Sequence, residues 1–165
     1  MKFDLIKITD LSGSKATIYA IKPEGVDTTL FDDFIIKYQE SFPDEINYIL
    51  TTLNIMGKKY GARSGYFKDK EGSPGDFMKA LYDSPGKNLR LYCIEMNSCV
   101  VIIGSGALKP KSVKAWQDDV TLYNAAAQTK ACADVIMRRI DKGLLFWTSN
   151  QEELEGDFND FETKD

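Results

Sequence analysis

The side chains with the greatest capacity for chemistry stand near the middle of this chain. Within the apolar run 89–96, a period of two places Arg90 and Tyr92 on one face of an expected strand. Lys109 and Lys111 follow the next apolar run, on either side of a proline that favours an extended backbone. These residue types are typical of a site that binds phosphate. A guanidinium can bind two phosphate oxygens, a phenol can stack on a base or donate a hydrogen bond, and two ammonium groups on a stiff loop can contact backbone phosphates.

Each of these residues also has a plainer interpretation. Arg90 could lie on the solvated face of the sheet and pair with an acid such as Asp83 or Glu95, because an arginine is costly to bury without a partner. The two lysines could be merely solvated at the end of a strand. The pattern therefore predicts either a phosphate site or an ordinary charged surface, and the exposure of Arg90 distinguishes the two.

Charge is distributed unevenly along the chain. Residues 58–115 carry 11 Lys or Arg against 5 Asp or Glu, whereas both flanking segments are acidic and the whole chain has a net charge of −4. A basic segment of this kind favours contact with a nucleic-acid backbone. The further cations that we expect to bind nucleic acid are Lys58, Lys59, Arg63, Lys68 and Lys114.

The absence of histidine excludes whole classes of catalysis. Ser-His-Asp and Cys-His centres and the HExxH zinc proteases all require that side chain. Any proton transfer would therefore fall to Lys, Tyr, Asp or Glu. The three cysteines form no CxxC pair and fit the core of a cytoplasmic protein. The run Gly104-Ser105-Gly106 lacks the third glycine of a dinucleotide-binding loop. We expect no metal, no nucleotide cofactor, no signal peptide and no membrane span.

Hydrophobic periodicity predicts a mixed α+β domain. The chain opens with a hairpin, and two amphipathic helices follow. One helix is capped by Thr28 or Thr29, and the other begins at Pro43 and ends at Gly57. The remaining expected elements are strands over 80–82, 89–94 and 100–103, a late helix over 122–140 that Gly143 ends, and an edge strand over 144–148.

Residues 151–165 form an acidic segment. From Gln151 the chain holds seven acids and one base, with only three apolar residues. This composition predicts a mobile tail after a single domain over residues 1–150. The tail could fold over the basic middle as a tethered mimic of nucleic acid, although a solvated terminus is the simpler interpretation.

The middle of the chain also resembles a known family. The runs Ala80-Leu81-Tyr82-Asp83, Arg90-Leu91-Tyr92-Cys93-Ile94 and Val100-Val101-Ile102-Ile103 precede a Lys109-Pro110-Lys111-Ser112 turn and a late helix. Over about residues 30–142, this order is similar to that of the RelE/HigB-like toxins of bacterial type II toxin–antitoxin systems, phage-derived relatives included.

The resemblance implies a small antiparallel sheet with helices packed on one face, here with an added N-terminal hairpin and a late helix. Members of this family often cleave mRNA on the ribosome with basic and aromatic side chains of the open face, and an antitoxin protein controls them. Carried over to this chain, Arg90 would stabilise the scissile phosphate, and Lys109 and Lys111 would match the lysine pair of the family. A lysine or Tyr92 would then assist proton transfer, which needs a shifted pKa.

Two functions follow as expectations. The first is a cytoplasmic, toxin-like protein that acts on RNA, could be a metal-independent endoribonuclease, and has an antitoxin as its partner. The alternative is a catalytically silent protein-interaction module with the same fold. The basic and aromatic residues favour the first, whereas the missing histidine and the acidic overall balance favour the second.

Overall fold

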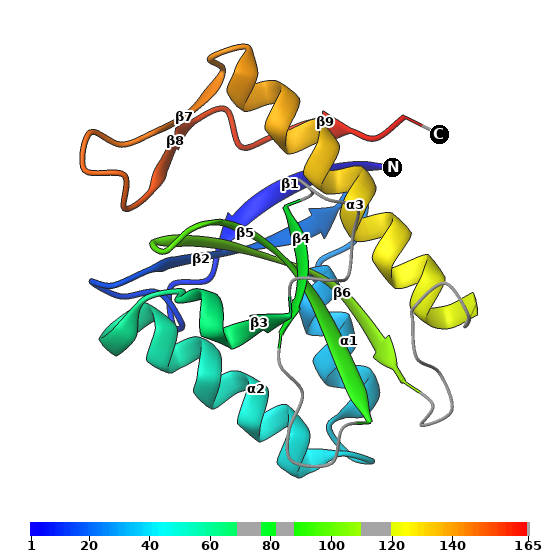
Figure 1. Cartoon of the computed structure of the whole chain (residues 1–165). Coiled ribbons are helices and arrows are strands. Elements are labelled where there is room, and N and C mark those ends of the chain that lie inside the picture. Colours follow the sequence, from blue (N-terminus) through cyan, green and yellow to red (C-terminus); the bar gives the residue numbers. More distant parts are fainter. Residues whose placement is uncertain (69–76, 82–87, 110–119, 165) are drawn as a thin grey trace.

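The computed structural model describes residues 1–68, 77–81, 88–109 and 120–164, and a seven-stranded sheet forms its centre (Figure 1). In spatial order the strands are β3 (Phe67–Lys68), β4 (Met78–Leu81), β5 (Leu89–Asn97), β6 (Val100–Leu108), β2 (Thr17–Pro23), β1 (Lys2–Lys7) and β9 (Phe161–Glu162). The β2–β6 pair is parallel, and the other neighbours are antiparallel. The predicted α+β class and the opening β1–β2 hairpin are thus confirmed.

The first two helices begin where the sequence predicts. In α1 (Leu30–Tyr38), the Thr29 hydroxyl accepts a hydrogen bond from the Asp32 amide at 3.0 Å, and the Asp32 carboxylate accepts one from the Thr29 amide at 2.9 Å. This reciprocal capping box satisfies two N–H groups that the helix leaves open. The helix α2 (Pro43–Ile55) starts at Pro43, whose fixed φ suits the first helical position.

The predicted end of the second helix at Gly57 is wrong. The helix continues into a π-helical turn, η1 (Met56–Tyr60), and ends at Gly61, which has a φ of 78°. Gly57 instead allows close approach of the β1–β2 loop, because its carbonyl oxygen accepts from the amides of Lys15 and Ala16. A Cβ at Gly57 would lie 1.9 Å from the carbonyl oxygen of Leu11. A short 3-10 turn, η2 (Ser64–Tyr66), then leads into β3.

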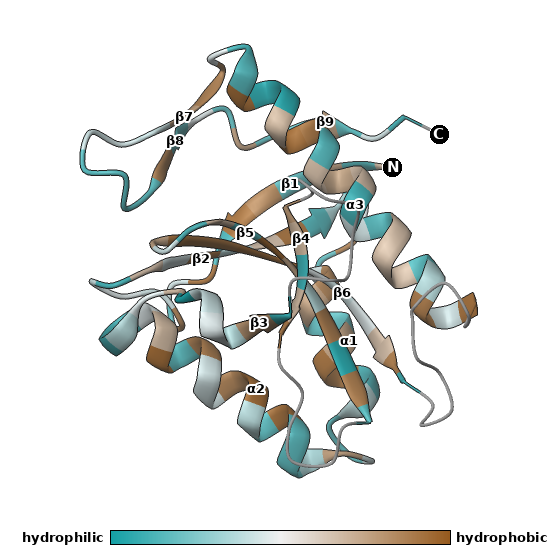
Figure 2. Ribbon diagram, viewed as in Figure 1, coloured by the Kyte–Doolittle hydropathy of each residue, from teal (hydrophilic) through white to brown (hydrophobic). Residues whose placement is uncertain are grey.

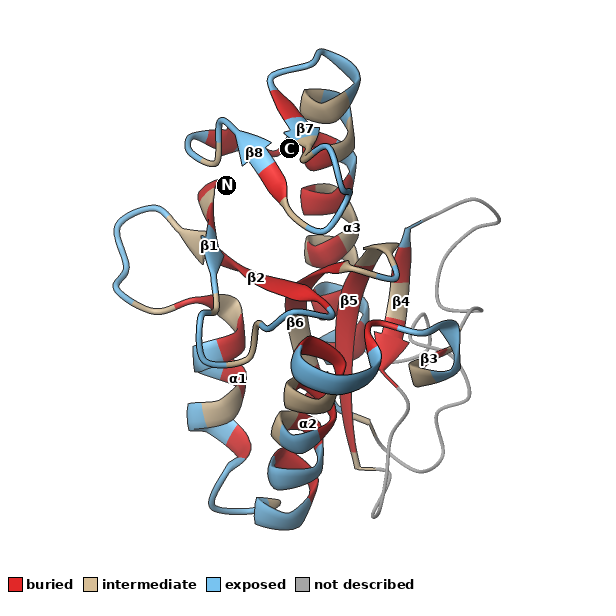
Figure 3. Cartoon of the chain, turned by 90° about the vertical axis from the view of Figure 1, so that its left-hand side faces the viewer, coloured by how far each residue is buried: buried red, intermediate tan, exposed pale blue. Residues whose placement is uncertain are grey.

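Helices cover both faces of the sheet, which corrects the expectation that they pack on one face. On β6, Val101 and Ile103 belong to the core that α1 and α2 complete. Their neighbours Val100 and Ile102 belong to a second core beneath α3 (Val120–Asp141). The central strands are accordingly apolar along most of their length (Figure 2) and buried on both faces (Figure 3). The face that the resemblance leaves open is closed here.

The helix α3 rests on a bulge in β6. Leu91 pairs with Gly106 and Cys93 with Ile103, so that Gly104 and Ser105 together stand opposite Tyr92. The amide of Ser105 is thereby turned to the Thr129 hydroxyl of α3, at 3.0 Å. A Cβ at Gly104 would lie 2.4 Å from the Thr129 methyl group, which leaves room only for glycine.

The acidic C-terminal segment is part of the folded structure, in contrast to the mobile tail that its composition predicts. The expected strand over 144–148 forms as β7 (Leu145–Trp147) but pairs with β8 (Leu154–Gly156) in a separate two-stranded sheet. Beyond it, β9 pairs with β1, and the Arg139 guanidinium of α3 lies 3.7 Å from the centroid of the Phe161 ring. Burial of Leu154 and Phe161 outweighs the local excess of acids.

We expect Gly104→Ala to lower the free energy of unfolding by about 1–3 kcal/mol, because the added methyl group must displace a hydrogen-bonded Thr129. Urea unfolding followed by circular dichroism measures this. Gly65→Ala is the matched control, since nothing lies within 4 Å of its added Cβ, and its effect should stay below about 0.5 kcal/mol. Equal stability of the two variants would contradict the close packing of α3 against Gly104.

Candidate functional site

Arg90 and Tyr92 are enclosed in the structure. Both side chains lie on the face of β5 that α3 covers, and they are 3% and 0% exposed. Tyr92 packs in a small core with Ala80, Ala107 and residues of α3. The solvated-face interpretation of Arg90 is therefore wrong, and an open phosphate site is not formed by this pair as it stands. Of its two expected acidic partners, Glu95 pairs with Lys79 at 2.9 Å, and Asp83 lies outside the described residues.

The strand order brings further predicted residues towards Arg90 and Tyr92. Lys109 follows β6, and its amide donates to the carbonyl oxygen of Asn88 at 2.6 Å, beside the start of β5. Lys68 stands opposite Ala80, which stands opposite Tyr92, so the three share one face of the sheet. Lys111 and Lys114 lie outside the described residues. Of the expected catalytic lysines, Lys109 lies beside the start of β5, and the pair Arg90 and Tyr92 is buried.

A buried carboxylate that sequence reasoning missed fixes the start of β5. Glu45, in the first turn of α2, is 5% exposed and accepts hydrogen bonds from the Asn88 amide, the Asn88 side chain and the Leu89 amide at 2.7, 2.9 and 3.2 Å. The sequence signal is an acid just after Pro43, a position that also suits the positive end of the helix dipole. The structure shows that it also joins α2 to the central sheet.

The exposed cations of the predicted set gather around Tyr60 at the end of η1. We call Lys58, Lys59, Tyr60 and Arg63 the Tyr60 patch. The Lys59 ammonium lies 5.1 Å and the Arg63 guanidinium carbon 5.3 Å from the centroid of the Tyr60 ring, which is within cation–π range. Tyr60 itself is 43% exposed. A π-helical turn of this kind often marks a functional position.

The backbone beneath the Tyr60 patch is held from both sides. The Arg63 Nε donates to the Tyr60 carbonyl oxygen at 3.0 Å, and the Ala62 amide donates to the carbonyl oxygen of Ser98 in the β5–β6 turn at 2.7 Å. Lys58 donates to Asn54 at 2.6 Å and to the carbonyl oxygen of Asp10. Lys15, exposed and bonded through its amide to Gly57, adds a cation that sequence reasoning did not single out.

The Tyr60 patch carries three positive charges. Within the described parts of the chain, neither Lys58, Lys59 nor Arg63 forms an ion pair with a carboxylate. The acidic C-terminal segment starts beside the β5–β6 turn, where the Asn97 side chain donates to the carbonyl oxygen of Gln151, and then runs along β1 and α3. None of its described carboxylates forms an ion pair with these cations. An exposed aromatic ring beside cations that no described carboxylate pairs with can stack a base and hold the adjoining phosphates.

The cysteines serve the core. Burial raises the pKa of Cys93 to about 12, with a further contribution from the charge of Glu95, and burial also raises the pKa of Cys132 to about 12. Neither thiol is a nucleophile near neutral pH. In the ranges that the structure describes, no three acids or cysteines converge as a metal site would require. No helix within those ranges has the length and apolar character to cross a membrane.

At about pH 8, we expect a disulfide reagent to modify Cys99 in the folded protein and to modify Cys93 and Cys132 only after unfolding. The reason is that the two buried thiols hold their protons far above this pH. The absorbance of the thiolate that the reagent releases, with and without guanidinium chloride, gives the number of modified cysteines. The Cys99→Ser variant should show no fast phase, and fast modification of a second thiol in folded protein would refute the assignment.

Comparisons of the chain with protein-family models, with curated proteins and with solved structures find no match. The site is therefore defined by the chain's own geometry: a covered pair, Arg90 and Tyr92, and an exposed basic and aromatic patch at Tyr60.

Proposed function

We propose that this protein binds single-stranded RNA through the Tyr60 patch. The observation that carries the proposal is the exposed Tyr60 ring with two cations within cation–π range, on a backbone anchored to the β5–β6 turn. Stacking on an aromatic ring tolerates any base, and lysine and arginine supply the phosphate contacts. The resemblance to RelE/HigB-like toxins supports RNA as the ligand and an antitoxin protein as the partner that controls the activity.

We further propose that binding occurs without cleavage at Arg90 and Tyr92. A group that stabilises a scissile phosphate must reach it at hydrogen-bond distance, and these two residues are buried, Tyr92 among residues of α3. The chain also has no histidine that could transfer protons near neutral pH. This proposal shares the lack of catalysis with the silent protein-interaction alternative, but it assigns RNA as the ligand.

Tyr60→Ala should weaken the binding of a fluorescein-labelled uridine oligonucleotide of about ten nucleotides by roughly tenfold, because one stacked base is lost. The combined change of Lys58, Lys59 and Arg63 to alanine should reduce the slope of log affinity against log salt concentration by about 2. Fluorescence anisotropy at several salt concentrations measures both effects.

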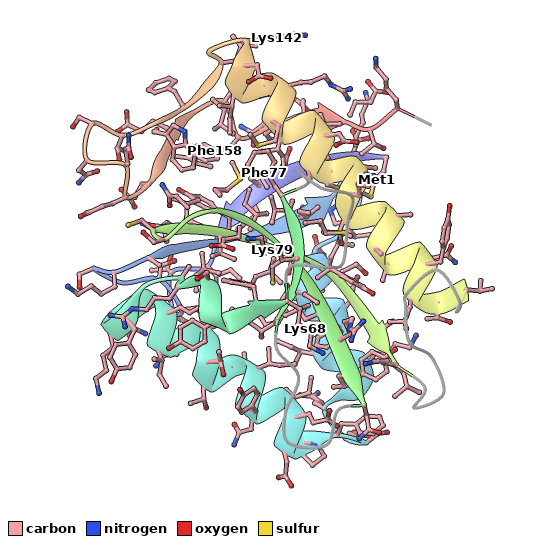
Figure 4. The ribbon with its side chains drawn as sticks, in the orientation of Figure 1. Met1, Lys68, Phe77, Lys79, Lys142 and Phe158 are labelled. Atoms are coloured by element: carbon pink, nitrogen blue, oxygen red, sulfur yellow. The ribbon has the colours of Figure 1, made fainter. Side chains whose placement is uncertain are left out.

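Two variants serve as controls for this experiment. Tyr48→Ala removes a tyrosine of α2 that is similarly exposed, at 37%, but has no cation over its ring among the described residues. Lys142→Ala removes an exposed cation at the far end of α3 (Figure 4). Both should bind RNA as the unchanged protein does. Equal losses in the controls and in the patch variants would show only nonspecific charge attraction.

Induction of the chain in a bacterium should leave total mRNA intact by primer extension and northern blotting. The Arg90→Ala variant, checked for folding by circular dichroism, should give the same pattern, since Arg90 does not reach RNA. mRNA cleavage that disappears in a folded Arg90→Ala variant would overturn the non-cleaving proposal and establish the endoribonuclease. Binding by the Tyr60 patch is tested separately by the anisotropy experiment.

A further inference from the structure

The edge of the main sheet beside β1 is only partly covered. β9 pairs with Lys2 and Phe3, and the Leu5 amide donates to the carbonyl oxygen of Phe158 at 2.8 Å. Among the residues that the structure describes, no strand pairs with β1 beyond Phe3 on this side. We call the stretch from Leu5 to Lys7 the β1 edge. Its Leu5 amide is bonded to Phe158, and beyond that amide no described strand pairs with it on this side.

The pairing of β1 with β2 determines which backbone groups face this edge. Ile6 stands opposite Ala20, and the Ile8 amide donates to the carbonyl oxygen of Ile18 at 2.7 Å, so the even-numbered residues bond to β2. The N–H and C=O groups of Lys7 consequently point away from β2 and towards the open side. Unpaired groups in this arrangement are a template for another strand.

Two apolar grooves flank the β1 edge, one on each face of the sheet. The first, of about 330 Å³, is lined on the α3 face mainly by Leu5, Tyr19, Leu154 and Phe158. The second, of about 440 Å³, lies between β1 and the helices α1 and α2, and its apolar lining is Ile6, Ile8, Leu11, Phe31, Ile35 and Leu50. Phe158 of the C-terminal segment borders the first groove (Figure 4).

We propose that the β1 edge binds an extended segment of another protein, which adds a strand beside β1. Successive residues of a strand point to opposite faces, so two adjacent residues of the bound segment would enter the two grooves in turn. Both grooves have apolar walls, and we therefore assign a pair of adjacent large apolar residues to the bound segment. This proposal does not depend on RNA binding by the Tyr60 patch.

The surroundings of the edge favour a single extended segment over a second copy of this chain. The open stretch is short, and the chain's own residues from Phe158 to Phe161 occupy the edge on one side of it. The β7–β8 hairpin stands beside the same edge, where Lys7 and Glu153 form an ion pair at 2.7 Å (Figure 3). Two copies joined edge to edge would bring these hairpins together, whereas one added strand would meet only a single hairpin.

The charged side chains around the two grooves indicate which residues should flank the apolar pair of the bound segment. The Lys7 and Glu153 side chains are each 46% exposed and border the first groove. Asp10 and Asp32 border the second groove. We expect polar or charged residues on either side of the apolar pair, since they would meet these groups at the rim.

Selection of a displayed library of random twelve-residue peptides on the full-length protein tests the proposal. Peptides with two adjacent large apolar residues should be recovered. Their affinity, measured by calorimetry with the synthetic peptide, should fall at least about tenfold in Lys7→Pro, which removes the edge N–H without removing a bond to β2. Lys7→Ala keeps that N–H and should retain most of the affinity.

A second pair of variants tests the groove. Ile6→Asp places a charge in the second groove and should abolish binding, whereas Ile36→Asp changes an even more exposed apolar residue of α1 outside both grooves and should not. Recovery of no binding peptide, or of peptides that bind Lys7→Pro unchanged, would overturn the proposal. Concentration-dependent dimers that Lys7→Pro abolishes, seen by sedimentation, would instead assign the edge to a second copy and would equally overturn it.

Discussion

The packing of α3 against the central sheet is the contact on which the rest of the structure depends. The β6 bulge turns the Ser105 amide to the Thr129 hydroxyl, and Gly104 leaves the space that the helix needs. Burial of apolar residues on this face is thereby completed, and the strands β5 and β6 become the two-sided core of the domain. The run Gly104-Ser105-Gly106 could be mistaken for a phosphate-binding loop. In the structure, it allows α3 to pack closely against β6.

This contact also decides where chemistry can occur. Arg90 and Tyr92 stand on the face that α3 closes, so the residues best suited by type to handle phosphate are the least accessible. Ligands can reach two surfaces at the periphery of the domain. One is the Tyr60 patch on the π-helical turn at the end of α2, and the other is the β1 edge, which the C-terminal segment covers only in part. The two surfaces are built from different elements and can have different ligands.

Local patterns predicted most of the elements because the forces that form them are local. The Thr29 capping box, Pro43 at a helix start, Gly143 after α3 and the period of two in β5 all act within a few residues. The misplaced end of α2 has the opposite origin. Gly57 carries the sequence signal of a cap, but its backbone is used by the β1–β2 loop, which contacts it only in the folded chain.

The acidic segment after Gln151 shows the same distinction. Composition alone predicts a solvated tail, since charge outnumbers apolar side chains. The few apolar residues present, Leu154, Phe158 and Phe161, nevertheless find partners in β1, β2 and α3, and Arg139 accommodates the Phe161 ring. A segment is ordered by the surface that it meets, and no local pattern describes that surface.

By itself, the sequence determined the mixed class of the fold, the order of its elements, the lack of histidine chemistry and the cations that could meet a phosphate backbone. Only the tertiary structure decided that Arg90 and Tyr92 are enclosed, that Lys59 and Arg63 lie against an exposed ring, and that β1 keeps an open edge. The physical reason is that exposure depends on which distant element covers a face. The position of α3, 22 residues long and remote in sequence from β1 and α2, is set by long-range packing that local periodicity does not encode.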